Sequence, residues 1–153
     1  MGIAVTLHVL SVVIWVGGMF FAYLALRPAL AAEEPLLRAR IWAGVFRRFF
    51  GWVWVAVIVI LASGLYMLFV NLGGFAQAPL FVHAMFGLGL LMMLLFAHVY
   101  FAPYRRLQRG LAAGDASVTG KALSQIRLLI AINLVLGIIV IIVAMTGTFA
   151  FFS

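Results

Sequence analysis

The chain has 153 residues, of which 68% are hydrophobic and only 8% are charged, and its formal net charge is +7. Soluble globular domains carry about a quarter charged residues, so this composition excludes a soluble protein and indicates a small multi-pass membrane protein. The sequence contains no cysteine, which excludes disulfides, iron–sulfur clusters held by cysteine and covalent c-type haem attachment. A bound metal would therefore need histidine, methionine or oxygen ligands.

The first apolar segment covers about residues 3–26 and is long enough to cross a bilayer. We expect it to end at Arg27 and Pro28, because proline removes a backbone donor and disfavours helix at the residue before it. It has no cationic start and no small-residue cleavage site, which favours a retained helix over a signal peptide. The basic segment that continues to Arg48 predicts either a short helix on the membrane surface or a solvated connection.

Two further spans follow at about residues 50–70 and 81–101, and the short uncharged loop between them predicts an antiparallel hairpin. The polar segment Ser117–Gly120 offers capping residues ahead of a fourth span at about residues 128–145. The sequence therefore predicts an all-α membrane protein. We expect the whole chain, residues 1–153, to form a single antiparallel bundle of four transmembrane helices.

All ten basic residues lie in two of the three predicted connections and their flanks. They are Arg27, Arg38, Arg40, Arg47, Arg48, Arg105, Arg106, Arg109, Lys121 and Arg127. By the positive-inside rule both basic connections face the cytoplasm, which predicts that the N- and C-termini lie outside. This topology explains the positive charge without nucleic acid as a partner. We expect a multi-pass protein of the bacterial inner membrane in contact with the lipid bilayer; a redox partner such as a quinone and a homodimer stay open.

Three histidines are the main candidate functional residues, because an ionisable group inside a membrane is costly and usually has a function. His8 lies near the outer end of the first span and His83 near the outer end of the third, so the two share a depth. His98 lies 15 positions beyond His83, roughly 22 Å along the helix axis, on the cytoplasmic side. The sequence therefore predicts one outer site between spans one and three, with His98 as an interfacial anchor or part of a second site.

Helical periodicity predicts which faces of these spans point into the bundle. The predicted faces are His8, Ser11, Trp15 and Met19 on the first span and His83, Gly87, Leu90, Leu94 and His98 on the third. Gly87, one turn from His83, leaves room for a flat macrocycle beside the backbone, although small residues also serve close helix packing. Met67, Met85 and Met145 stand at the same outer depth and offer soft sulfur ligands, although methionine also fills gaps in helix bundles.

A histidine–methionine set suits haem iron or Cu(I). Ions that prefer carboxylates would find no ligand, because the three acidic residues all lie in the connections. His83 and Met85 are about 200° apart around the helix, so they cannot both face the bundle interior squarely. The interior face predicted by periodicity favours His83 as the ligand.

Several stretches of the chain resemble a known family. They are LHVLSVVIWVGGMFF in the first span, RRFF and SGLYMLF in the second, and LFVHAM at the start of the third. These stretches resemble the CopD copper-resistance membrane family and its relative HemJ, the membrane protoporphyrinogen oxidase family. For the HemJ branch, the resemblance implies that the histidine of span one and a lysine two residues after the histidine of span three ligate haem b. These positions are His8 and Met85 here, and the missing lysine counts against oxidase activity.

Three functions of different classes fit these residues. The leading prediction is a b-type haem protein in electron transfer, in which His8 with His83 or Met85 holds the haem beside Gly87. Against it stands the absence of outer-side Arg or Lys to pair with the haem propionates. The alternatives are a copper-binding or copper-transport protein, which uses the same ligands with Met67 and His98 as further candidates, and an accessory bundle without a cofactor.

Overall fold

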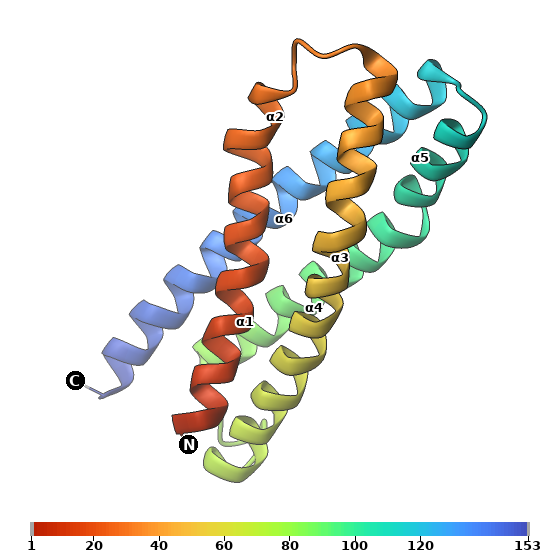
Figure 1. Ribbon diagram of the computed structural model, residues 1–153. Coiled ribbons are helices and arrows are strands. Elements are labelled where there is room, and N and C mark those ends of the chain that lie inside the picture. Colours follow the sequence, from red (N-terminus) through yellow and green to blue (C-terminus); the bar gives the residue numbers. More distant parts are fainter. Residues whose placement is uncertain (1, 153) are drawn as a thin grey trace.

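The computed structural model describes residues 2–152, and all the elements in this range are helices joined by short turns (Figure 1). In chain order they are α1 (Gly2–Phe21), the π-helical segment η1 (Ala22–Leu26), α2 (Arg27–Ala29), α3 (Pro35–Tyr66), the π-helical segment η2 (Met67–Asn71), α4 (Leu80–Phe101), α5 (Pro103–Ala112) and α6 (Ala116–Phe152). Within the described part of the chain, four continuous helical stretches are long and apolar enough to cross a membrane. They run alternately up and down, which confirms the predicted all-α bundle of four antiparallel spans.

The first span does not end at Arg27 and Pro28 as expected, because helix continues through both residues to Ala29. The backbone N–H of Arg27 donates to the carbonyl of Ala22, five residues earlier, as in a π-helix. This wider turn accommodates the ring of Pro28, which a regular helix would bring against a carbonyl of the preceding turn.

Two predicted helix starts were also wrong, because each of these helices begins earlier in the chain than expected. The basic segment expected on the membrane surface is the start of α3, where the Glu34 carboxylate accepts hydrogen bonds from the backbone N–H groups of Leu36 and Leu37 at 3.3 and 3.2 Å. Likewise, Ser117–Gly120 lies inside α6, and the cap is Asp115, whose carboxylate accepts from two backbone N–H groups. In both cases a carboxylate at the N-cap position fixes the start of the helix.

All ten basic residues lie toward one end of the bundle, where α2, the start of α3, α5 and the start of α6 gather (Figure 1). We call this the basic end. Both chain termini lie toward the opposite end, which we call the termini end, together with the loop between η2 and α4. The predicted segregation of charge is therefore a property of the folded protein.

Aromatic rings fill the half of the bundle next to the basic end. Ring centroids lie 5.5 Å apart for Phe50 and Phe96, 5.0 Å apart for Trp54 and Phe96, and 5.5 Å apart for Trp54 and Tyr100. These pairs join α3 to α4, and their size holds the two helix backbones apart. By contrast, α1 packs closely against α3, and α4 packs closely against α6.

Glycines allow the closest helix crossings. A Cβ atom at Gly18 would collide with the ring of Phe49 on α3, and one at Gly137 would lie 2.8 Å from Cγ2 of Val16. These two positions therefore set how near α1 approaches α3 and α6. Gly87 has open space where a Cβ atom would be, so it serves no comparable contact in the described structure.

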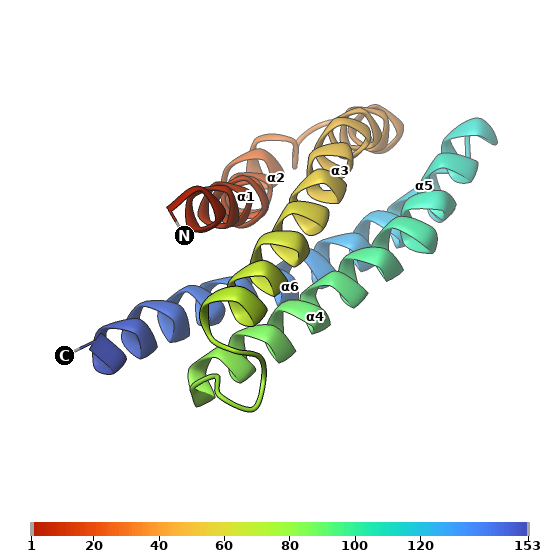
Figure 2. The same cartoon turned by 90° about the horizontal axis from the view of Figure 1, so that it is seen from below.

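Packing is sparse in the half next to the termini end. No residue from Ile138 to Phe151 is buried. In the views of Figures 1 and 2, α6 crosses α1 obliquely, so that its C-terminal part leaves the α1–α3 pair. Most of the side chains in this half of the protein therefore face lipid or the space between the helix pairs.

Candidate functional site

His8 is the histidine that the fold holds most firmly. Its half-buried ring places Nδ1 2.9 Å from the hydroxyl oxygen of Ser63 on α3. The Ser63 hydroxyl donates its own proton to the carbonyl of Val59, so it accepts from Nδ1–H of His8. The carbonyl of Ile60 lies close enough to the His8 ring to act on it electrostatically. Hydrogen bonding at Nδ1 leaves the lone pair of the neutral imidazole on Nε2, the state in which histidine ligates a metal.

Gly64 gives the His8 ring its place beside α3. A Cβ atom at Gly64 would lie 3.3 Å from Cε1 of His8, a separation that would displace the ring by a few tenths of an ångström. Ser63 and Gly64 were not among the predicted site residues, although both belong to the stretch SGLYMLF. A serine–glycine pair inside a span of bulky residues is the signal that could have located them.

The depth of each candidate ligand can be measured from one crossing point, where Gly137 meets Val16 and the methyl group of Met92. His8 lies eight residues from Val16 toward the termini end, about 12 Å along α1. Met85 lies seven residues from Met92 in the same direction, about 10 Å along α4. His8 and Met85 therefore lie at similar distances from this crossing point along their own helices.

Met67 belongs to the same region of the bundle. It follows Ser63 by one helical turn, at the junction where α3 passes into the π-helical segment η2, and its side chain is half-buried. Single π-helical turns are uncommon and are often found at functional sites. Met145 is 62% exposed on α6, so its sulfur faces away from the packed helices.

The predicted interior face of the third span is wrong. His83, Gly87 and His98 are all exposed, and Leu90 and Leu94 have exposed fractions of 44% and 61%. The buried face consists of Met92, Met93, Phe96 and Val99. Because α4 is apolar all round, hydrophobic periodicity carries almost no information about which side packs.

This correction changes which residue of α4 faces the other helices. Met85 precedes Met92 by seven residues and Phe96 by eleven, so it lies on the buried face, and its side chain is half-buried. His83 is exposed at the start of α4, where Nδ1 lies 3.3 Å from the carbonyl oxygen of Pro79 and the ring contacts Phe75.

The structure brings His8 together with Ser63 and Gly64 on α3, and it surrounds His83 with residues of the loop before α4. Neither histidine has the other among its hydrogen-bond or ring partners in the described part of the chain. Gly87 is exposed and faces open space on the side of α4 away from the packed helices, so it does not form a cleft against α1. The geometry therefore gives the haem prediction no support.

Within residues 2–152 no group of three histidine or carboxylate side chains lies close enough together to hold a metal. The methionines of the spans offer sulfur as a further kind of ligand. Methionine sulfur selects soft ions such as Cu(I) over zinc, calcium or magnesium.

One more polar group lies inside the bundle. Asn133 on α6 is 4% exposed, and its Nδ2 donates to the carbonyl of Met92 at 3.2 Å, whereas its Oδ1 has no hydrogen-bond partner. A cavity of about 10 Å³, close to the size needed for one water molecule, lies between Asn133 and the side chains of Trp15 and Met19.

A family model described as Copper resistance protein D (CopD) matches residues 43–146, which is more than half of the chain. The protein belongs to the CopD family. The matched range includes Ser63, Met67 and Met85, while His8 precedes it. No curated protein and no solved structure matched the chain. The CopD resemblance noted in the sequence is thus confirmed, whereas a relation to HemJ stays a prediction.

Proposed function

We propose that this CopD-family protein binds Cu(I) in the termini half of its bundle as the cargo of a copper-handling membrane protein. The observation that carries the proposal is the hydrogen bond from Nδ1 of His8 to Ser63, which leaves Nε2 as a neutral nitrogen ligand. Family membership supplies the expected metal. Neutral nitrogen and thioether ligands are those that Cu(I) prefers.

We assign the sulfur ligands to Met67 and Met85. Met67 lies one turn beyond the residue that orients His8, and Met85 lies on the buried face of α4 at a distance from the Gly137 crossing similar to that of His8. Both side chains are half-buried, which leaves their sulfur atoms within reach of an incoming ion. By the positive-inside rule the termini end faces outward, so copper would meet these ligands from the outer side of the membrane.

The central test is a Cu(I) titration of the purified protein under anaerobic conditions against a coloured Cu(I) chelator. Replacing His8 by alanine removes the only nitrogen ligand of the proposed site, so His8→Ala should weaken binding by about tenfold or more. His98→Ala is the matched control, because His98 is exposed on α4 in the basic half, and it should bind as the wild type does. Equal losses in both variants would refute the site.

A second pair of variants tests whether Met85 or His83 is the copper ligand on α4. Met85→Ala should weaken Cu(I) binding, whereas His83→Ala should leave it close to the wild-type value, because the exposed His83 ring contacts its own loop. If His83→Ala has the larger effect, the ligand on α4 is His83 and the outer face of that helix takes part in binding.

The visible spectrum of the purified protein distinguishes copper from haem. Cu(I) has a filled d shell and leaves the dithionite-reduced protein without bands, whereas haem b gives a sharp Soret band and α-band. We expect no haem bands. Their presence at one haem per chain would replace the copper proposal with the electron-transfer function, and a protein that retains neither group would favour an accessory bundle.

A further inference from the structure

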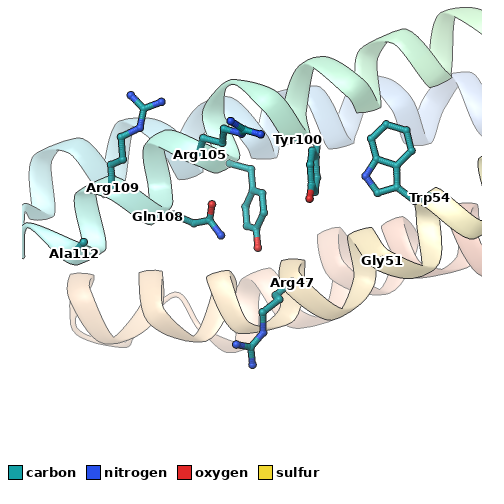
Figure 3. A pocket seen from close by; sticks show the side chains of 9 residues that line it. Arg47, Gly51, Trp54, Tyr100, Arg105, Gln108, Arg109 and Ala112 are labelled. Carbon is teal, nitrogen blue, oxygen red and sulfur yellow. The ribbon is translucent and has the colours of Figure 1, made fainter.

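A second candidate site lies at the basic end, about half the length of the bundle from the copper ligands. It is a pocket of about 600 Å³ between α3 and the α4–α5 stretch (Figure 3). Its lining residues are Arg47, Gly51, Trp54, Tyr100, Tyr104, Arg105, Gln108, Arg109 and Ala112. The pocket exists because the aromatic pairs described above hold α3 and α4 apart.

The charge around this pocket is entirely positive. Figure 3 shows Arg105 and Arg109 on the α5 side of the opening and Arg47 on the α3 side, with the guanidinium groups of Arg47 and Arg109 pointing away from each other, so that these side chains would turn inward on a ligand. No carboxylate lines the pocket. Arg47 lies near enough to the hydroxyl of Tyr104 to act on it electrostatically, and the side chain of Gln108 lies beside the same hydroxyl. The pocket thus combines three cations with neutral hydrogen-bonding groups.

The arginines of the pocket have no protein acceptor in the described part of the chain, a property they share with Arg40, Lys121 and Arg127 at the same end but not with Arg38 and Arg48. Arg38 and Arg48 each donate to a backbone carbonyl, at 3.2 and 3.0 Å. In the described part of the chain, Arg47 and Arg109 donate no side-chain hydrogen bond, and Arg105 has only a contact with the ring of Phe101, 5.2 Å from its centroid. Their guanidinium donors are therefore available to a ligand.

We propose that this pocket binds the phosphate of an anionic phospholipid headgroup. Guanidinium groups bind phosphate through two parallel hydrogen bonds, and phosphate needs no carboxylate nearby. Tryptophan and tyrosine favour the depth of lipid headgroups, and Trp54 and Tyr100 line the membrane side of the pocket. A soluble phosphate ester shares the phosphate chemistry, but only a lipid would also use this apolar, ring-lined wall.

The test measures lipid binding to the purified protein in a neutral detergent, by native mass spectrometry and by thermal stability. Dioleoylphosphatidylglycerol is the anionic probe and dioleoylphosphatidylcholine the neutral one. The triple variant Arg47→Gln, Arg105→Gln and Arg109→Gln should bind the anionic lipid about tenfold more weakly or worse. It should no longer prefer that lipid over the neutral one.

A matched triple variant carries the same loss of charge at the same end but outside the pocket: Arg40→Gln, Lys121→Gln and Arg127→Gln. It should keep the wild-type lipid preference. Equal losses in the two triple variants would mean general attraction to the charged end and would overturn the proposal.

Gly51→Leu provides a test that does not change charge. Gly51 lines the pocket and has open space where a Cβ atom would be, so a leucine there fills the pocket without a clash in the bundle. It should lower binding of the anionic lipid even if the triple variant does not fold. Unchanged binding would place the lipid elsewhere.

Inorganic phosphate and glycerol 3-phosphate serve as soluble competitors and distinguish the two sources of phosphate. We expect millimolar concentrations of either to leave the bound lipid in place. If they displace it and protect the protein equally well in the absence of lipid, the pocket binds a soluble phosphate compound, and the lipid assignment is wrong.

Discussion

The hydroxyl of Ser63 should control copper affinity without touching copper. In the wild type it accepts from Nδ1–H of His8 at 2.9 Å and so keeps Nε2 free of its proton. Ser63→Ala removes this acceptor while it keeps the helix and the small side chain beside the ring. The imidazole then loses its fixed orientation and can adopt the tautomer with the proton on Nε2, in which Nε2 no longer has a lone pair for the metal.

The expected magnitude follows from hydrogen-bond partners of metal-bound histidines in general. Loss of such a partner lowers metal affinity by about 10- to 100-fold, or about 1.4–2.7 kcal/mol. The carbonyl of Ile60 still lies near the ring and favours a proton on its side, so we expect the lower value, about tenfold. The free energy of unfolding should fall by only about 1 kcal/mol, the net value of one hydrogen bond.

Anaerobic Cu(I) competition measures the affinity, and thermal unfolding in the same detergent measures the stability. Ser11→Ala is the control, because it removes a buried hydroxyl one turn from His8 on the same face of α1. It should leave the affinity unchanged. If Ser63→Ala binds Cu(I) like the wild type while His8→Ala does not, Ser63 has no part in orienting the ligand.

Three further predictions concern the bundle. Reporter fusions after Gly74 should report the periplasm and fusions after Gly114 the cytoplasm, and a cytoplasmic signal at Gly74 would reverse the proposed orientation. Gly137→Ala should lower the free energy of unfolding by about 1–3 kcal/mol, because its Cβ atom would lie 2.8 Å from a side chain of α1. Gly89→Ala meets open space and should not lower it, so equal melting temperatures of the two variants would contradict the close packing of α6 against α1 at Gly137. Asp115→Ala should cost about 1 kcal/mol through loss of the α6 cap, and unchanged stability would mean that the cap is not needed.

The sequence was sufficient for the number of spans, their antiparallel order and the gathering of charge at one end. Composition and span length determine these features, because a membrane leaves the chain few other folds. Helix ends were harder to predict, since Pro28 lies within a helix that a π-turn widens, and Glu34 and Asp115 cap helices whose first turns lie outside the apolar stretches.

The face of each span that packs against the other helices was the feature hardest to predict from the sequence. On α1 the expected face was largely right, because Ser11, Trp15 and Met19 are buried there and His8 is half-buried. On α4 it was wrong, because a helix that is apolar on every side shows no contrast between lipid and protein neighbours. The contact between His8 and Gly64 joins residues far apart in the chain, and no single-sequence pattern reports such a pair.

The uneven packing of the bundle bears on how a metal could leave it. Around the aromatic pairs between α3 and α4, a relative movement of the helices would break many ring contacts at once. In the other half no residue from Ile138 to Phe151 is buried, although Gly147 packs against the ring of Phe81 on α4. We expect the helices to change their spacing more easily there. A copper carrier, which is one form of the proposed function, must release its ion as well as capture it, and ligands on loosely packed helices can separate without unfolding the protein. We therefore expect amide hydrogen exchange to be slow at Phe50 and Phe96 and to become faster along each helix toward the copper ligands.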